Sequence, residues 1–209
     1  MTVTTTNAFD LQRIQLIRKW VLGIALLAAV GLAFVSSSPW VGRPLSEAIE
    51  SVGLGAIVIS IVGRAWCSLY IGGRKKAEIV SNGPYSISRN PLYVFSYFGA
   101  FGVGAQTGSF SMGVLFVVIA VAVFHFTIRQ EEAWLTAEFG DAYRDYMART
   151  PRCGPAFSKW RDDAELTVRP QFFLTTIRDG LVFLLAVPIF ESVDWVQAQG
   201  WLPVLIHLP

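Results

Sequence analysis

The chain has 209 residues, of which 53% are hydrophobic and only 15% are charged. Soluble domains carry about 25% charged residues, so this composition excludes an ordinary soluble protein and indicates an all-α integral membrane protein with a single domain, residues 1–209. The formal net charge is only +2, and we expect membrane lipids as surroundings and no nucleic-acid partner.

The first apolar segment, residues 20–42, contains no charged side chain. A helix that spans a bilayer needs about 20 apolar residues, so this segment is long enough. Residues 11–19 before it are basic and apolar, which suits a short interfacial helix. A cleaved signal peptide has the same order of a basic stretch and an apolar run, but the spans that follow favour a retained first helix.

The second predicted span covers residues 47–72 and is interrupted by Arg64. An arginine at membrane depth is costly and normally faces a cavity or a partner. The alternative is that Arg64 extends towards the interface, because it lies about two helical turns from Gly72. The pattern alone leaves both interpretations open.

The loop that follows, residues 81–93, reads SNGPYSISRNPLY. Gly83–Pro84 is a turn signal, because glycine has free φ and proline fixes the next one. Asn90–Pro91 is typical of a helix start, with an N-cap followed by proline at the first helical position. The loop therefore delivers Tyr85 and Arg89 to a helix N-terminus, where free N–H groups and the helix dipole favour an anion.

Residues 90–128 contain no Asp, Glu, Lys or Arg. This run is too long for one span and predicts a helical hairpin with its turn at residues 106–109. Small residues recur every four positions on the first arm, a spacing that lets membrane helices approach closely and would also admit a flat ligand. These residues are Ser96, Ala100, Gly104 and Gly108.

Two further segments complete the predicted fold of four to five transmembrane helices. Residues 131–147 are predicted to form one amphipathic helix after the hairpin. The C-terminal extension, residues 171–209, is apolar but broken by Arg178–Asp179 and Pro188, and we expect one tilted or broken helix and an interfacial tail. The apolar face of the amphipathic helix comprises Leu135, Phe139, Ala142, Tyr143 and Tyr146.

The basic residues fix the orientation. With four spans, Arg43 is the only one placed outside, Arg64 lies within a span, and the remaining 15 of the 17 fall on the side of the N-terminus and the loop 81–93. The positive-inside rule makes that side cytoplasmic.

Polar groups converge at this cytoplasmic mouth, because the two arms of a hairpin bring its ends to the same depth. The loop 81–93 lies before the third span, and Glu131 lies at the end of the fourth. His125, Arg129 and Glu132 share a helical face through their i, i+4 and i+3 spacing. A collar of charges that anchors the hairpin is the structural alternative to a binding site.

Two stretches, GPYSISRNPLY and EEAWLTAEFGDAYRDYMARTPR, flank the apolar hairpin. In this order they resemble the isoprenylcysteine carboxyl methyltransferase family of integral membrane enzymes, and the membrane phospholipid N-methyltransferases look similar over the same stretch. The resemblance covers Arg64 to Arg152, under half the chain. The matching residues are Gly83, Tyr85, Arg89, Pro91, Tyr93, Glu131, Glu132, Phe139, Gly140, Tyr143, Tyr146, Pro151 and Arg152.

The resemblance implies an S-adenosylmethionine-dependent methyltransferase with its core at residues 63–153 and a cytoplasmic cofactor site formed by the loop, the hairpin and the amphipathic helix. It also implies a lipid-like or apolar small-molecule acceptor that enters from the bilayer, oriented by Arg64 as the catalytic residue. No metal is required for such a reaction. The cofactor-binding residues it implies are Gly83, Tyr85, Arg89, Asn90, Pro91, Tyr93, His125, Glu131, Glu132, Tyr143 and Tyr146.

Asn90 departs from the family pattern, which has histidine there. Asparagine does not titrate, so a general base at this position is excluded while hydrogen bonding remains available. The span before the loop also lacks a carboxylate near Arg64, which leaves the acceptor open among a prenylcysteine-like carboxylate, a phospholipid amine and a small apolar thiol or carboxylate.

Two other functional classes fit a polar cytoplasmic mouth. A sterol-type membrane reductase would use NADPH, with the run 74–76 (Arg-Lys-Lys) as the contact for its 2′-phosphate, although positive-inside anchoring explains that run as well. A non-catalytic membrane scaffold would keep the fold without the chemistry. The two cysteines, Cys67 and Cys153, have no ligand-like spacing to a histidine, so we expect two free thiols and no metal site.

Overall fold

We describe a computed structural model of the chain, covering residues 23–24, 27–74 and 77–209. The interfacial helix predicted at residues 11–19 lies outside the described residues. The predicted first span lies partly outside them, and its described residues 23–24 and 27–35 are helical.

The second predicted span is confirmed as α2 (Pro44–Ile71), which begins with proline at its first position. The predicted hairpin is confirmed as α4 (Pro91–Ala105) and α5 (Phe110–Phe139). Its turn ends at Ser109, whose side chain caps α5 by accepting a hydrogen bond from the Met112 N–H over 3.2 Å. Each helix therefore starts where the sequence carries a proline or a capping side chain.

Small residues bring the helices together as predicted. A Cβ on Gly108 would lie 2.2 Å from the Ser46 hydroxyl oxygen of α2. A Cβ on Gly104 would lie 2.6 Å from the Met112 carbonyl oxygen of α5. Distances this short leave no room for a flat ligand at these two positions, so close helix packing is the correct interpretation of the small-residue spacing there.

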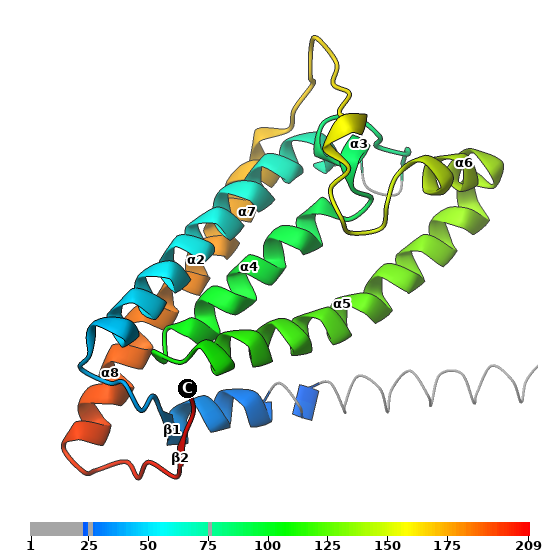
Figure 1. Cartoon of the computed structure of the whole chain (residues 1–209). Coiled ribbons are helices and arrows are strands. Elements are labelled where there is room, and N and C mark those ends of the chain that lie inside the picture. The colour runs from blue at the N-terminus through cyan, green and yellow to red at the C-terminus, as the bar shows by residue number, and fades with distance from the viewer. Residues whose placement is uncertain (1–22, 25–26, 75–76) are drawn as a thin grey trace, which may run out of the picture.

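The predicted single helix over residues 131–147 is wrong. α5 continues to Phe139, the chain turns at Gly140 with φ of +56°, and α6 (Asp141–Arg149) then runs separately. Glycine adopts this conformation without the clash that a side chain would bring. Because of the turn, α6 folds across the end of the hairpin instead of extending it (Figure 1).

The C-terminal extension forms a broken helix, as predicted, made of α7 (Pro170–Leu181), the 3-10 turn η2 (Val182–Leu185) and α8 (Ala186–Ala198). Together they are long and apolar enough to cross a membrane. After α8, the short strand β2 (Ile206–His207) pairs in parallel with β1 (Ser36–Ser37), which precedes α2, and no sequence pattern predicted this pair.

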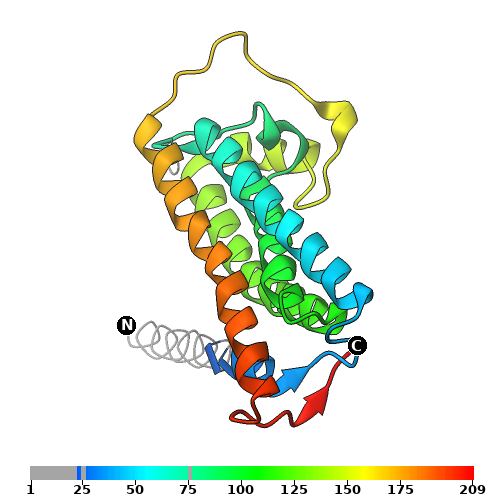
Figure 2. The same ribbon diagram turned by 90° about the vertical axis from the view of Figure 1, so that its left-hand side faces the viewer.

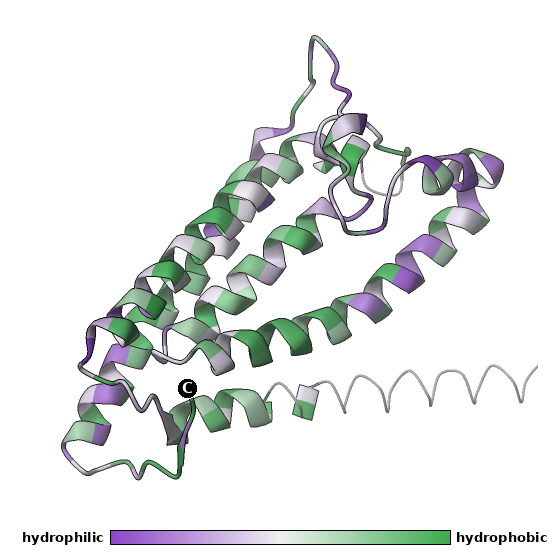
Figure 3. Ribbon diagram, viewed as in Figure 1, coloured by the Kyte–Doolittle hydropathy of each residue, from purple (hydrophilic) through white to green (hydrophobic). Residues whose placement is uncertain are grey.

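Figures 1 and 2 show α2, α4 and the α7–α8 segment packed side by side, while α5 diverges from α4 towards its C-terminal end. In Figure 3 the bodies of these helices are mainly hydrophobic and the polar residues gather where α3 (Pro84–Ile87), the 3-10 turn η1 (Phe157–Lys159) and α6 meet. Among the described residues, three helical segments have the length and composition of membrane spans, and α4 is a shorter apolar helix. The protein is an all-α membrane protein.

Candidate functional site

The centre of the polar end is a buried carboxylate held by two arginines. Glu132, on α5, is only 6% exposed. The Arg152 side chain donates to it through Nη2 over 2.7 Å and through Nε over 3.1 Å, and Arg89 Nη1 lies 3.2 Å from its second oxygen. Ion pairs of this bidentate kind fix geometry as well as charge. The cluster of Arg89, Glu132 and Arg152 carries a net charge of one positive unit.

The loop 81–93 brings Arg89 to this cluster through a turn at Gly83. Gly83 has φ of +54°, and a Cβ there would lie 2.2 Å from the Tyr70 ring. Both the backbone conformation and the close ring therefore require glycine. The turn leads into α3, which is fully buried, and then to Arg89 and the start of α4.

A second segment, residues 151–163, lies over the loop, and we call it the strap. Three backbone hydrogen bonds join the two: Arg89 N–H to the Pro151 carbonyl, Ala156 N–H to the Ile87 carbonyl, and Gly83 N–H to the Arg161 carbonyl, at 2.7–2.9 Å. The Tyr70 hydroxyl also donates to Asp162 over 2.8 Å. The strap fixes the loop in place.

Asn90 is the N-cap residue of α4 by position, as predicted, but its side chain makes no capping bond. Its Nδ2 instead donates to the Arg152 carbonyl over 2.9 Å. The residue that replaces the family's histidine therefore ties the loop to the strap, next to the arginine that holds Glu132.

Three of the predicted tyrosines are buried around the cluster. Tyr146, on α6, donates from its hydroxyl to the Tyr85 carbonyl over 2.7 Å. Burial, and then the nearby Glu132 carboxylate, raise the pKa of Tyr143 to about 12. Burial also raises the pKa of Tyr85 well above its ordinary value. These phenols stay neutral at physiological pH and act as hydrogen-bonding, aromatic walls.

Tyr93 and Glu131 form a neighbouring pair between α4 and α5. The Tyr93 hydroxyl interacts with the Glu131 carboxylate, and the Tyr93 ring lies 4.8 Å from that of Phe124. The two glutamates of the double-glutamate motif therefore have different surroundings. Glu132 is engaged by two guanidinium groups, whereas Glu131 meets a phenol.

Two side chains predicted at the mouth do not join the cluster. His125 and Arg129 are exposed on α5, and His125 contacts the ring of the adjacent Phe126. The three positions lie within an arc of about 60° on α5, but about 10.5 Å of helix separates His125 from Glu132, whose partners come from the loop and the strap. Sequence spacing could not tell which level along α5 faces them.

Arg64 lies deeper along α2, away from the cluster. Its guanidinium carbon is 5.4 Å from the centre of the Phe183 ring of η2, and Asp179 of α7 interacts with its charge. Arg64 therefore has a partner at membrane depth, in the C-terminal extension. Its Nε is buried without a hydrogen-bond partner, and so is the hydroxyl of Ser60 one turn earlier.

Buried donors without partners also occur in the cluster. The Arg89 Nε and the Tyr85 hydroxyl have no hydrogen-bond acceptor among the residues that the structure describes. Such groups are rare in native structures and mark a place where a ligand or a water completes the site. A cationic N–H donor beside buried aromatic rings fits a zwitterionic cofactor with an aromatic base.

Arg152 was matched to the family pattern but given no role in the sequence analysis. In the sequence, the Pro151–Arg152 pair of the family motif is the signal that marks this arginine. Its pKa is raised, first by its hydrogen bonds to Glu132 and then by the charge of that carboxylate. Sequence spacing could not predict that Glu132 and Arg152 form an ion pair, because the turn at Gly140 determines how far apart they lie in space.

Comparison with known proteins agrees with this arrangement. Residues 52–142 match the phospholipid methyltransferase family model. Over 90 residues, 43% of this chain and 38% of the other, it is 31% identical to the protein-S-isoprenylcysteine O-methyltransferase of Schizosaccharomyces pombe. The chain belongs to the isoprenylcysteine carboxyl methyltransferase-like family of membrane proteins.

Two bacterial relatives cover more of the chain. The nickel-cobalt-cadmium resistance protein NccN of Alcaligenes xylosoxydans xylosoxydans is 32% identical over 189 residues, 90% of this chain and 86% of that protein. The cobalt-zinc-cadmium resistance protein CzcN of Cupriavidus metallidurans is 33% identical over 171 residues, 82% of this chain and 79% of that protein. No solved structure matches significantly. The likeness to these two metal-resistance proteins therefore covers more of the chain than residues 52–142.

Proposed function

We propose that this protein is an S-adenosylmethionine-dependent methyltransferase that acts on a membrane-partitioned acceptor. One observation carries the proposal: Glu132 holds Arg89 in a buried cluster while the Arg89 Nε remains unpartnered. A guanidinium fixed in this way has a free donor for a carboxylate, and the family relationship supports the carboxylate of the cofactor as that ligand.

The proposed cofactor site combines the loop, the hairpin end and α6. Arg89 would bind the carboxylate, and Glu131 is the carboxylate available to an ammonium or a ribose hydroxyl, because Glu132 is engaged by two arginines. Tyr85, Tyr93, Tyr143 and Tyr146 supply aromatic faces. Gly83, Asn90 and Pro91 shape the loop, and Glu132 positions Arg89. His125, which the resemblance had implied, is omitted from this proposal because its side chain is exposed.

The cofactor, when bound, supplies an electrophilic methyl group on a sulfonium. The chain's own residues bind and orient the two reactants and exclude water from the site, which accounts for most of the rate enhancement such a transfer needs. Aromatic rings beside the sulfonium would stabilise its charge by about 0.5–2 kcal/mol through cation–π contact. The donor loses its positive charge during the transfer, so a dry site favours the reaction, whereas the cation–π contact favours binding of the cofactor.

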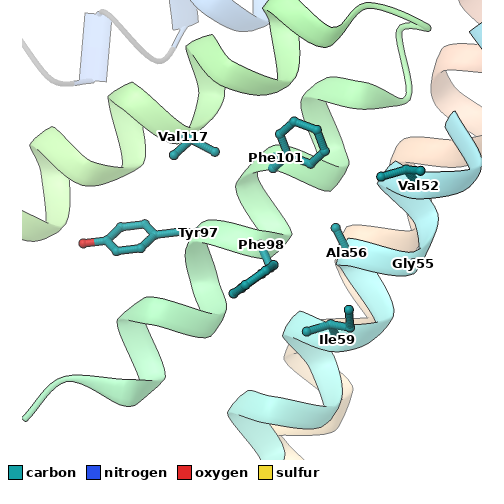
Figure 4. A pocket seen from close by; sticks show the side chains of 8 residues that line it. All are labelled: Val52, Gly55, Ala56, Ile59, Tyr97, Phe98, Phe101 and Val117. Atoms are coloured by element: carbon teal, nitrogen blue, oxygen red, sulfur yellow. The ribbon is translucent and has the colours of Figure 1, made fainter. Parts of the chain in front are cut away.

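The acceptor we propose has an apolar chain, because an apolar pocket opens within the membrane layer. Its volume is about 480 Å³, and α2, α4 and α5 line it. Figure 4 shows Tyr97 at one side of the pocket as its one polar lining residue. The other lining residues are Val52, Gly55, Ala56, Ile59, Phe98, Phe101 and Val117.

Arg64 is the proposed catalytic residue on the acceptor side. Its buried, unpartnered Nε and the Ser60 hydroxyl are donors at membrane depth, where an anionic or carbonyl group of the acceptor would accept them. An arginine donor buried at membrane depth without an acceptor is costly, which supports a ligand role over interfacial snorkelling. We propose a cytoplasmic orientation for the cluster on the distribution of basic residues.

The metal-resistance names of two relatives support a physiological context. We propose that methylation by this protein contributes to tolerance of cobalt, nickel, cadmium or zinc by altering a membrane-partitioned compound. Growth of cells with and without the gene in each metal salt tests this context, and an inactive Glu132→Gln gene should behave as the deletion.

Calorimetric titration of the detergent-purified protein separates the functional classes. S-adenosylhomocysteine should bind with a measurable heat, and NADPH should not. Binding of NADPH alone would establish the reductase alternative, for which Arg74 is less suited because it pairs with Glu78 over 3.0 Å; Lys75 and Lys76 lie outside the described residues. Binding of neither would indicate the scaffold. Lipidomic comparison of cells with and without the protein then identifies the acceptor.

A further inference from the structure

The strap exposes two large aromatic residues beside a membrane-spanning helix. Phe157 is 74% exposed and Trp160 is 43% exposed. Phe157 begins the short turn η1 and Trp160 directly follows it, and neither contributes to the Arg89–Glu132–Arg152 cluster. Large apolar side chains exposed next to each other mark a contact surface.

The depth of this surface is fixed by a ring contact with α2. Trp160 stacks on Trp66, with ring centres 5.7 Å apart and an angle of 18° between the planes. Trp66 lies five residues before the end of α2 at Ile71, so it is about 7.5 Å below that end.

α2 is long enough to show where the membrane boundary falls. Its 28 residues extend about 42 Å, against about 30 Å for the hydrocarbon core of a bilayer. If the excess is shared between the two ends, the boundary lies about 6 Å from Ile71. Trp66 and Trp160 are then at the boundary, the depth at which tryptophan is enriched in membrane proteins.

The charge of the surrounding chain identifies the occupant. Residues 149–163 carry four basic side chains, and their two acidic ones, Asp162 and Asp163, accept hydrogen bonds from Tyr70 and Asn82. Arg152 is engaged by Glu132, and Lys159 donates to the Arg149 carbonyl. Among the described residues, the Arg161 side chain beside the two aromatics has no hydrogen-bond acceptor. Basic residues next to exposed aromatic ones fit the headgroups of an anionic leaflet.

We propose that the strap is a membrane-interface anchor: Phe157 and Trp160 insert into the headgroup boundary of an anionic leaflet, and Arg161 contacts its headgroups. Because the strap bonds to the loop through Gly83 and Arg89, the anchor holds the proposed cofactor loop at a fixed depth. The anchor does not depend on the proposed function, since it rests on exposure, ring stacking and charge alone.

Spin-label accessibility in nanodiscs tests the anchor. The full-length protein carries a nitroxide at Phe157→Cys in a Cys153→Ser background, because Cys67 is fully buried and does not label. Glu165→Cys, an exposed position on the same polar segment, is the matched control. In nanodiscs with phosphatidylglycerol, position 157 should collide more with oxygen than with a nickel chelate, and position 165 should show the reverse.

Each other outcome overturns the proposal. Preference for the nickel chelate at position 157 would place the strap in water. Protection from both reagents would mean that protein, such as a second copy of the chain, covers it. The label at position 157 should lie less deep in nanodiscs of phosphatidylcholine alone than in nanodiscs with phosphatidylglycerol. Arg161→Gln should abolish this difference in depth. If the difference is unchanged in the variant, Arg161 does not contribute to the anchor. Thermal unfolding of each variant shows that it is folded.

Discussion

Arg152 and Glu132, twenty residues apart, form a bidentate ion pair in which Nη2 and Nε of the arginine donate to the carboxylate oxygens Oε2 and Oε1 at 2.7 and 3.2 Å. The second carboxylate oxygen meets Arg89 at 3.2 Å, so one buried glutamate connects the loop before α4 to the strap after α6. Glu132 therefore shapes the site by fixing two arginines, and the properties of the cluster depend on its charge.

Replacement of Glu132 by glutamine should destabilise the protein and weaken binding of S-adenosylhomocysteine. Removing one partner of a buried ion pair costs about 3–5 kcal/mol, because Arg89 is left charged and unpaired. We expect affinity to fall by roughly tenfold or more, equal to about 1.4 kcal/mol or more. Thermal unfolding and calorimetry measure the two effects. Glu138→Gln, on the exposed side of the same helix, should change neither; equal losses in both variants would contradict a specific role.

Replacement of Arg152 by lysine should lower the affinity for S-adenosylhomocysteine almost as much as Arg152→Ala. The amine keeps the charge but cannot reproduce the paired donors of the guanidinium. The same titration measures the affinity of both variants for S-adenosylhomocysteine and so compares the lysine variant with the alanine variant. Wild-type affinity in the lysine variant would show that charge alone, and not bidentate geometry, holds Glu132.

Gly83→Ala should destabilise the fold more than Gly140→Ala. The two glycines have nearly the same backbone conformation, with φ of +54° and ψ of −133° against φ of +56° and ψ of −127°. Each substitution carries backbone strain of about 1–3 kcal/mol, but only Gly83 also faces a ring, that of Tyr70. The difference between their unfolding temperatures isolates the packing term. Equal shifts would mean that Tyr70 moves aside without cost.

Arg64→Gln should leave the affinity for S-adenosylhomocysteine unchanged and remove methyl transfer. Arg64 lies apart from the cluster, against Phe183 in the C-terminal extension. A radiolabelled cofactor with either a farnesylated cysteine analogue or phosphatidylethanolamine vesicles as the probe acceptor measures transfer. Ser60→Ala, which removes the neighbouring unpartnered hydroxyl, should give a smaller loss. Full transfer by Arg64→Gln would restore the snorkelling interpretation.

Tyr143 should make the protein sensitive to alkali. Its pKa is raised to about 12 in the folded state, against about 10 in an unfolded chain. The neutral phenol therefore stabilises the fold fully below about pH 10, and this contribution is lost as the pH rises from about 10 to 12. Unfolding temperature should fall over this interval in the wild type and fall less steeply in Tyr143→Phe. If unfolding temperature falls with pH in parallel in the two proteins, groups other than Tyr143 cause the loss of stability in alkali.

The sequence by itself determined the membrane class, the hairpin and the start of α4, because apolar length, proline position and small-residue spacing are local properties of the chain. It also indicated which residues belong to the cofactor mouth, through two motifs on either side of the hairpin. The direction in which α6 runs was not available, since one glycine at position 140 reverses the chain, and this reversal brings Tyr143 and Tyr146 over the loop.

Only the tertiary structure decided how the charges are shared. Spacing treated Glu131 and Glu132 alike, yet adjacent helical positions point about 100° apart, so one meets Tyr93 and the other meets Arg89 and Arg152. Likewise, Arg64 was an isolated charge in its span until α7 and η2 folded against α2. Ion pairs between distant segments depend on how the helices cross and where the chain turns, and no local pattern of residues specifies those contacts.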